Sequence, residues 1–372
     1  MATALSMNFV FECILDARTG YGQVSVNLLK QFYKLGLQPN VFAIENNIIL
    51  TPFDPHSKEF IEWLETCLTK APREFDRSEP AVRYCQLVNA YSRVSTTRNI
   101  LLTAHELDAA TAAEVNIVRQ YDLTFFTCEY SANVFRQHPE IAGKVGKIPH
   151  GFDADSFMET GVRYQPDAVV FTLVGKLEKR KRQAQVLAAW ARKYGNQPGY
   201  VLNCALFAPF IAPESRKELL IKALGGKQYS NIRFFPFMPT NKEYNHFLNA
   251  GNIVLAMSGA EGFGLPEFQA VALGKYCVGL NATGYREWMT PQNTILVEPN
   301  GTEEVYDNVA FFKGQHVNQG NIFTFDDDEF IAACERAVAA YRAQPVNKAG
   351  LELQTRFTWE ASARAVLDAV SG

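Results

Sequence analysis

Residues 258–270 read SGAEGFGLPEFQA and follow an apolar run at residues 253–257. A run of that length that ends in a glycine-rich turn is typical of a buried strand in a parallel sheet. Pro266 favours the first turn of a helix, which we expect over residues 265–273. Glycines let the backbone approach a ligand closely, and the free N–H groups of a helix start attract anions or sugar oxygens. The stretch therefore predicts a strand–loop–helix unit with a ligand site in its loop, where Glu261 can accept hydrogen bonds from two neighbouring hydroxyls.

A second loop of this kind starts at Gly175. Residues 175–182 read GKLEKRKR and follow the apolar run of residues 169–174. Ligands bind at the carboxyl ends of strands in open parallel sheets, so this basic loop lies where a ligand is expected. Lys176 and Lys181 can neutralise a pyrophosphate there without a metal. The alternative for each loop alone is a structural turn, with an incidental glutamate in the first and solvated charges in the second.

Strand and helix patterns alternate along both halves of the chain. In the first half we expect strands at residues 7–15, 39–44, 100–103, 123–127 and 145–148, and helices at residues 24–35, 57–71 and 109–120. In the second half we expect strands at residues 169–175, 200–207, 232–235, 253–257, 276–280 and 294–297, and helices at residues 183–194, 215–223, 244–248, 265–273, 329–341 and 357–370. This alternation predicts an α/β protein with two Rossmann-like, doubly wound parallel-sheet domains that face a central cleft.

The composition is that of a globular enzyme. The chain has 372 residues, 47% of them hydrophobic, and a net charge of −3, which excludes a domain-wide basic field for nucleic acid or anionic lipid. No apolar run approaches the ~18 residues that span a bilayer, and residues 1–7 lack the basic start of a signal peptide. Seven scattered cysteines without a Cys-x-x-Cys pair indicate buried thiols in a reducing compartment, so we expect a soluble, cytoplasmic protein.

Several further motifs occur in a fixed order around these two loops. They are residues 20–22 (GYG), 105–106 (HE), 149–153 (PHGFD), 284–287 (GYRE) and 357–360 (FTWE). With the two loops, the ordered set resembles the retaining glycosyltransferases of family 4, in the glycogen synthase and mannosyltransferase-like superfamily with the GT-B fold. The resemblance spans nearly the whole chain. It implies an acceptor-binding N-terminal domain over residues 1–160, a nucleotide-sugar-binding domain over residues 161–350, and a helix over residues 351–372 that crosses back to the N-terminal domain.

The resemblance also implies roles for single residues. Lys176 and Lys181 would hold the donor's diphosphate and stabilise the leaving charge. Glu261 would bind hydroxyls of the donor sugar, and His105 would contact that sugar near the reacting carbon. Backbone groups would complete the site, namely those of Gly20, Gly22, Met238, Phe263, Gly264 and Leu265.

The chain departs from the family pattern at two positions. Gln269 stands where the family has a second glutamate for the nucleotide ribose, and a neutral amide holds a hydroxyl less strongly than a carboxylate does. Glu267 does not replace that carboxylate simply, because two residues along a helix are about 200° apart around it. Lys176 stands where arginine is usual, which exchanges a bidentate fork for a point charge.

The expected reaction is transfer of a sugar from a nucleoside-diphosphate sugar to an acceptor hydroxyl, with retention at the anomeric carbon. A UDP-sugar is the favoured donor and a GDP-sugar the second choice. We expect no cofactor and no essential metal. The acidic residues 326–328 resemble a metal-binding pair, but they precede a predicted helix, so we interpret them as an N-cap and its dipole partners.

Two other functions use the same fold and stay open at this point. One is a nucleotide-sugar epimerase or phosphorylase, and the other is a non-catalytic sugar-nucleotide binder, which Gln269 suggests. The acceptor is also open: a sugar, a glycan, a lipid-linked glycan or a hydroxymethylated DNA base. For DNA, three arginines interleaved with two tyrosines could contact backbone and bases, or they could be ordinary surface residues. These five residues are Arg83, Tyr84, Tyr91, Arg93 and Arg98.

Overall fold

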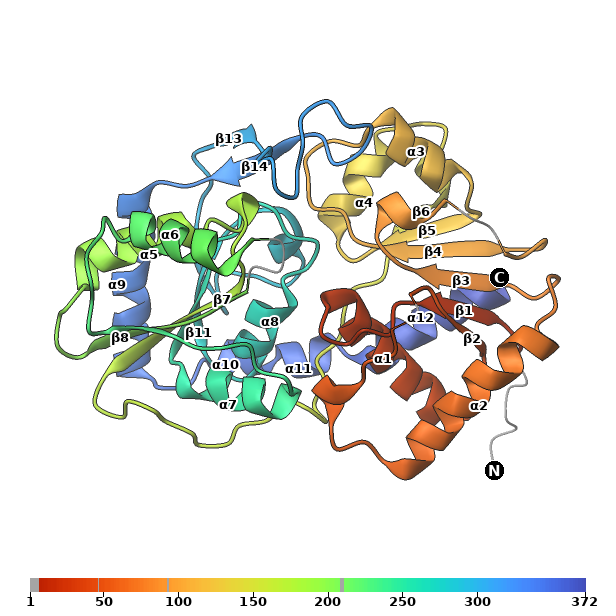
Figure 1. The fold of residues 1–372 in the computed structure, drawn as a ribbon, viewed down its shortest axis with the longest axis horizontal. Helices are drawn as coiled ribbons and strands as arrows, with labels where there is room; N and C mark the ends of the chain where they lie inside the picture. The colour runs from red at the N-terminus through yellow and green to blue at the C-terminus, as the bar shows by residue number, and fades with distance from the viewer. Residues whose placement is uncertain (1–6, 46, 92–93, 208–210) are drawn as a thin grey trace.

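The computed structural model describes residues 7–45, 47–91, 94–207 and 211–372. Its architecture is two parallel sheets of six strands each, flanked by helices and set side by side (Figure 1). This confirms the predicted α/β class with two doubly wound domains. Residues 1–6, where no signal peptide is expected, and Arg93, one of the candidate DNA contacts, lie outside the described residues.

The first sheet has the strand order β2-β1-β3-β4-β5-β6, and every neighbouring pair is parallel. Its strands are β1 (Val10–Cys13), β2 (Asn40–Ala43), β3 (Ala81–Tyr84), β4 (Asn99–Thr103), β5 (Leu123–Phe126) and β6 (Val145–Lys147). The helices of this domain are α1 (Gly20–Lys34), α2 (Lys58–Glu74), α3 (Ala112–Arg119) and α4 (Glu129–Arg136). Neither β3 nor α4 was predicted from the sequence, and the four residues of β3 are too few to show a period.

The second sheet has the strand order β12-β11-β10-β7-β8-β9 and is also parallel throughout. Its strands are β7 (Val169–Lys176), β8 (Tyr200–Phe207), β9 (Ile232–Phe234), β10 (Ile253–Ala256), β11 (Tyr276–Leu280) and β12 (Ile295–Val297). The helices that follow β6 are α5 (Gln183–Tyr194), α6 (Pro213–Ala223), α7 (Asn241–Ala250), α8 (Leu265–Ala272), α9 (Asp327–Ala343), α10 (Lys348–Leu351), α11 (Leu353–Arg356) and α12 (Trp359–Ser371). A small antiparallel hairpin, β13 (Gly301–Glu304) and β14 (Asn321–Thr324), was not expected from the sequence.

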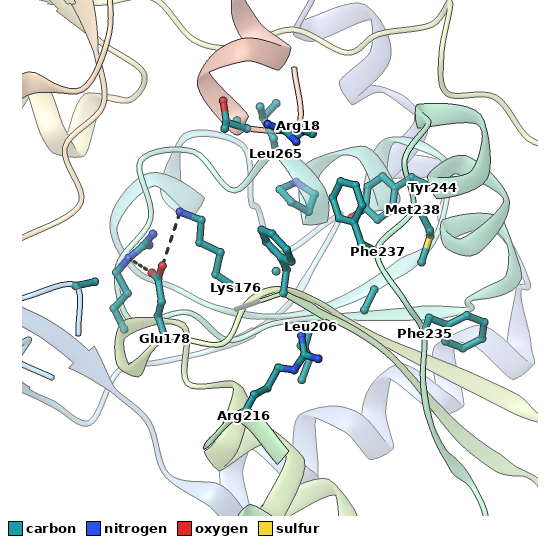
Figure 2. A pocket seen from close by; sticks show the side chains of 18 of the residues that line it. Arg18, Lys176, Glu178, Leu206, Arg216, Phe235, Phe237, Met238, Tyr244 and Leu265 are labelled. Carbon is teal, nitrogen blue, oxygen red and sulfur yellow. Dashed lines mark ion pairs between the residues drawn. The ribbon is translucent and has the colours of Figure 1, made fainter. Parts of the chain in front are cut away.

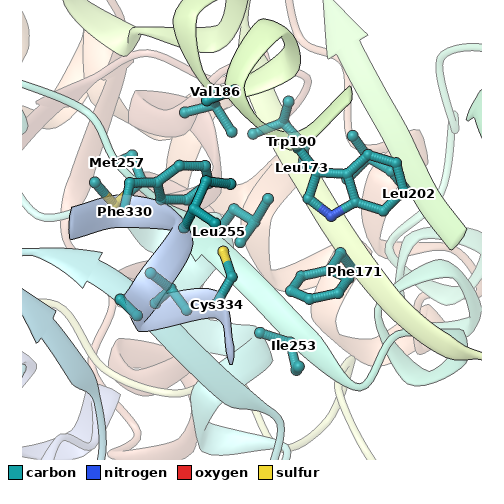
Figure 3. Close-up of a cluster of buried hydrophobic side chains, with 14 of the residues drawn as sticks. Phe171, Leu173, Val186, Trp190, Leu202, Ile253, Leu255, Met257, Phe330 and Cys334 are labelled. Carbon is teal, nitrogen blue, oxygen red and sulfur yellow. The ribbon is translucent and has the colours of Figure 1, made fainter. Parts of the chain in front are cut away.

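The apolar runs of the second domain meet in one dense core. Phe171 and Leu255 from the sheet pack with Trp190 of α5 and Phe330 of α9, and all four are almost fully buried (Figure 3). Burial of large apolar side chains is the main stabilising contribution to such a domain, at about 1.5–3 kcal/mol each. The rigid sheet that results fixes the positions of the loops at its carboxyl edge, where the site lies.

The helix starts agree with the local sequence. Thr19 caps α1 by accepting a hydrogen bond from the backbone N–H of Gly22 at 3.1 Å. The Asp326 carboxylate accepts hydrogen bonds from the N–H groups of Asp328 and Glu329, so the interpretation of residues 326–328 as a cap is confirmed.

The last helix joins the two domains. After α11 at the second domain, α12 runs back across and packs on α1 (Figure 1). Trp359 and Val366 of α12 lie in the core of the first domain. None of the helices within the described residues is both long and apolar enough to cross a bilayer.

Candidate active site

A large cleft lies between the carboxyl ends of the two sheets. It encloses about 1940 Å³, and residues of both domains line it. The first domain contributes the loops after β1, β3 and β4, and the second domain contributes the ends of β7, β8 and β9 together with the start of α8. The cleft therefore occupies the ligand position expected for open parallel sheets.

The site residues predicted from the sequence fall into two groups. Gly20, His105, Lys176, Met238, Leu265 and Gln269 line the cleft directly. Gly22, Lys181, Glu261, Phe263 and Gly264 are not among the lining residues, and all of them except Lys181 are buried. All of them gather at the same edge of the two sheets.

Lys176 is the most accessible predicted cation of the group. It ends β7, its side chain is 46% exposed, and its amine lies 3.7 Å from the Glu178 carboxylate (Figure 2). The first turn of α8 stands nearby with Leu265 and Pro266 at the wall, and its N-cap residue, Gly264, has no side chain. A lysine amine and a helix start at one wall suit a phosphate.

Lys181 and Glu261 form a buried ion pair although 80 residues separate them. The short 3-10 turn Lys179–Lys181 ends at Arg182, which has a left-handed φ of 59° and directs the chain into α5. Burial raises the pKa of the Glu261 carboxyl, but the nearby charges of Lys181 and Arg180 outweigh burial and lower it. Glu261 is therefore held ionised, as a hydrogen-bond acceptor for hydroxyls must be.

Arg180 is a component of the site that the sequence analysis did not single out. It is 7% exposed, and its guanidinium lies 3.0 Å from Glu178 of its own domain and 3.3 Å from Glu106 of the first domain. It also donates a hydrogen bond to the Ala260 carbonyl at 2.7 Å. The run of basic residues gave no sign of which side chain turns inward, because that depends on carboxylates contributed by distant segments.

Glu267 lies inside the second domain, not at the cleft. Burial, assisted by the negative charge of Glu261, raises the pKa of Glu267 to about 7. Gln269, in contrast, reaches the cleft wall although its side chain is mostly buried. This agrees with the expectation that Glu267 does not replace the missing carboxylate at position 269.

His105 follows β4 and is 4% exposed. Its Nε2 pairs with the Ala109 carbonyl at 3.0 Å, and its ring packs edge-on against Phe135. Its own carbonyl accepts a hydrogen bond from the Ser131 hydroxyl. The ring is thus held in one orientation at the wall of the cleft.

The two glycines of the GYG motif differ in the space around them, so the same substitution is expected to have different effects at the two positions. A Cβ on Gly22 would lie 1.9 Å from the Asp16 carbonyl oxygen, whereas a Cβ on Gly20 meets nothing within 4 Å. We expect Gly22→Ala to lower the free energy of unfolding by about 1–3 kcal/mol, as overpacking does. Gly20→Ala should leave stability unchanged and weaken ligand binding in the cleft. Urea unfolding and nucleotide titration of both variants check this, and equal stability of the two would contradict it.

The arginine–tyrosine array proposed for DNA contact is not a surface array. Tyr84 is buried in the core of the first domain, and Arg83 pairs with Glu12 at 2.9 Å. Only Tyr91 of the described members is a largely exposed aromatic residue, at 71%. For Arg83 and Tyr84 the DNA interpretation is therefore wrong, because β3 places them inside the sheet.

Comparison with known proteins adds a family match in the second domain. Residues 162–313 match the model of the family "Glycosyl transferases group 1". That is less than half of the chain. No curated protein sequence matches the chain significantly.

Solved structures match over nearly the full length. HepE of Anabaena, in complex with UDP and glucose, has 16% identity and a TM-score of 0.67 over 98% of this chain and 99% of that chain. Sucrose-phosphate synthase of Thermosynechococcus elongatus has 16% identity and a TM-score of 0.70 over 97% and 98%. The catalytic domain of starch synthase IV of Arabidopsis thaliana, bound to ADP and acarbose, has 11% identity and a TM-score of 0.68 over 98% and 99%. The fold is GT-B.

Proposed function

We propose that this protein is a retaining glycosyltransferase that moves a sugar from a nucleoside-diphosphate sugar to an acceptor hydroxyl. The observation that carries the proposal is the charge distribution of the cleft. The wall of the second domain presents Lys176 and the first turn of α8, where a diphosphate would bind. The family match over residues 162–313 supports the same assignment. UDP is the favoured nucleotide and GDP the second choice.

The acceptor is proposed to be an uncharged, hydroxyl-bearing molecule. Within the described residues, the charged side chains at the first-domain wall are Asp16, Arg18 and Glu106. Arg18 is bound by both carboxylate oxygens of Asp16, at 2.9 and 2.6 Å. A phosphate-rich acceptor such as DNA or a lipid diphosphate would need unpaired cations there, whereas carboxylates and amides suit sugar hydroxyls.

The proposed chemistry needs no protein nucleophile. The bond between the anomeric carbon and the phosphate oxygen breaks, and the acceptor oxygen bonds to that carbon on the same face. The departing phosphate oxygen takes the acceptor's proton, so atoms and charge balance. Lys176 and the first turn of α8 stabilise the phosphate charge, and Glu261, which Lys181 holds ionised beside the lining residue Arg180, is proposed to orient the donor sugar. His105 contacts that sugar from the opposite domain.

The first test is thermal unfolding with UDP, GDP, ADP and their common sugar conjugates, in EDTA and again with Mg²⁺. A ligand at about 100 times its Kd stabilises by ~2.7 kcal/mol, which raises the melting temperature by several degrees. We expect this shift with one base, unchanged by EDTA. No shift with any nucleotide would mean that Gln269 marks a degenerate donor site, and the proposal would be wrong.

The second test uses the donor that binds, in a screen of sugar and glycan acceptors. We expect a product with the donor's anomeric configuration, measured by NMR. An inverted product would contradict retention. Consumption of donor without an added hydroxyl would favour an epimerase or phosphorylase, and binding without turnover would favour a non-catalytic binder.

A further inference from the structure

Two segments from different domains meet at the upper end of the cleft. Residues 105–110, the cleft loop, follow β4 of the first domain. Residues 305–321, the arm, run from the end of β13 to the first residue of β14 in the second domain and extend to the neighbourhood of α3 and α4 (Figure 1). Both segments line the cleft, through His105 and Glu106 on one side and Phe311 and Asn318 on the other.

The centre of the contact is an apolar seat for Leu107. This first-domain side chain is 1% exposed, and the buried residues it packs with belong to the second domain. They are Ala260, Val305, Phe311 and Ile322. A leucine buried in this way becomes exposed to water if the two domains separate. Its burial therefore stabilises the arrangement in which the domains are in contact.

Polar contacts surround this seat. The Asp108 carboxylate accepts hydrogen bonds from the backbone N–H and the side-chain amide of Asn321, at 2.7 and 3.0 Å. The Glu114 carboxylate accepts one from the Asn318 N–H at 2.9 Å, and the Thr111 hydroxyl donates one to the His316 carbonyl at 2.7 Å. Each bond joins the first domain to the arm.

Gly320 is fitted to this contact. Its φ of +149° lies in the region that favours glycine, and a Cβ there would lie 2.8 Å from the Asp108 carboxylate. Any larger residue would therefore push the arm away from the cleft loop.

The residues next to Leu107 make further contacts. His105 bonds to the Ala109 carbonyl within the same loop, and Glu106 pairs with Arg180 across the cleft at 3.3 Å. The cleft loop thus has contacts of its own on both sides of Leu107 and Asp108.

We propose that Leu107 and Asp108 are positioning residues. Seated on the arm, they hold His105 and Glu106 at the reaction centre and keep the two domains at the distance that transfer requires. The proposal rests on the glycosyltransferase function proposed above, since it assigns His105 a place beside the donor sugar.

Two variants test the proposal from opposite sides. Leu107→Ala empties the seat, and Gly320→Ala displaces the arm while every residue of the cleft loop stays unchanged in type. We expect both to lower kcat about 10- to 100-fold, because a small misplacement of reacting groups is costly. The Kd of the nucleoside diphosphate should change less than threefold, since Lys176 and α8 lie in the second domain and Gly20 lies outside the contact of Leu107. Unchanged kcat in both variants would overturn the proposal.

A matched control and a readout without activity complete the test. Leu64→Ala removes the same atoms from a buried position in α2, so we expect lower stability with unchanged kcat. Hydrogen–deuterium exchange of Leu107→Ala should be at least about tenfold faster in both the cleft loop and the arm, and unchanged in β4. If the natural protein shows no transfer, the proposed function is wrong. Hydrogen–deuterium exchange still tests whether Leu107 couples the cleft loop to the arm, and faster exchange in the cleft loop alone would contradict that coupling.

Discussion

Replacing Lys181 with methionine will abolish most of the transfer activity and destabilise the protein. The substitution leaves the Glu261 carboxylate buried without its closest cation, and breaking a buried pair in this way costs about 3–5 kcal/mol. We expect kcat to fall at least about 100-fold, because Glu261 would lose the orientation proposed for binding the donor sugar. Urea unfolding and initial rates at saturating donor measure the two effects.

A double variant separates stability from function. Lys181→Met combined with Glu261→Gln removes both charges, so no unpaired charge stays buried and most of the stability should return. Activity should stay lost, since the ionised acceptor for the sugar hydroxyls is missing. A double variant as active as the natural protein would show that this pair has only a structural role.

The exposed pair of Lys58 and Glu62 on α2 is the control for this cycle. Its amine and carboxylate lie 3.4 Å apart, and both side chains are largely exposed. Because solvent screens such pairs, Lys58→Met and Glu62→Gln should leave stability and rate within experimental error.

Replacing Glu267 with glutamine will stabilise the protein above pH 7. Burial raises the pKa of this carboxyl from 4.5 to about 7, so the folded state binds its proton more tightly than the unfolded state does. The natural protein therefore loses stability as the pH rises from 4.5 to about 7, and a shift of this size corresponds to about 3 kcal/mol. The glutamine variant carries no charge and avoids that loss.

The measurement is the free energy of unfolding of both proteins at pH 4.5 and pH 8. We expect near-equal stability at pH 4.5 and an advantage of about 3 kcal/mol for Glu267→Gln at pH 8. Parallel pH profiles would show that Glu267 does not titrate between these values in the folded protein.

Local sequence signals predicted most of the second domain. The glycine-rich turn before Pro266 places the start of α8 correctly, and Asp326 caps α9, with Asp327 and Asp328 in the first turn of the helix. Such signals work because they act over a few residues: a cap satisfies N–H groups of its own helix, and an apolar run reports the burial of its own strand.

Other features had no local signal. The inward turn of Arg180 depends on Glu106 and Glu178, and the burial of Tyr84 depends on the strands beside β3. The arm carries no period or motif of its own, so neither it nor the seat for Leu107 could be predicted from the sequence.

The sequence by itself determined the order of most strands and helices, the two loops at which a ligand is expected, and the fold to which they lead. Only the tertiary structure decided which charges face the cleft and which neutralise one another behind it. The physical reason is that the free energy of a charge depends on burial and on partners within a few ångströms, and residues far apart in the chain supply both. Lys181 and Glu261, 80 residues apart, become a pair only when β7 and β10 lie side by side.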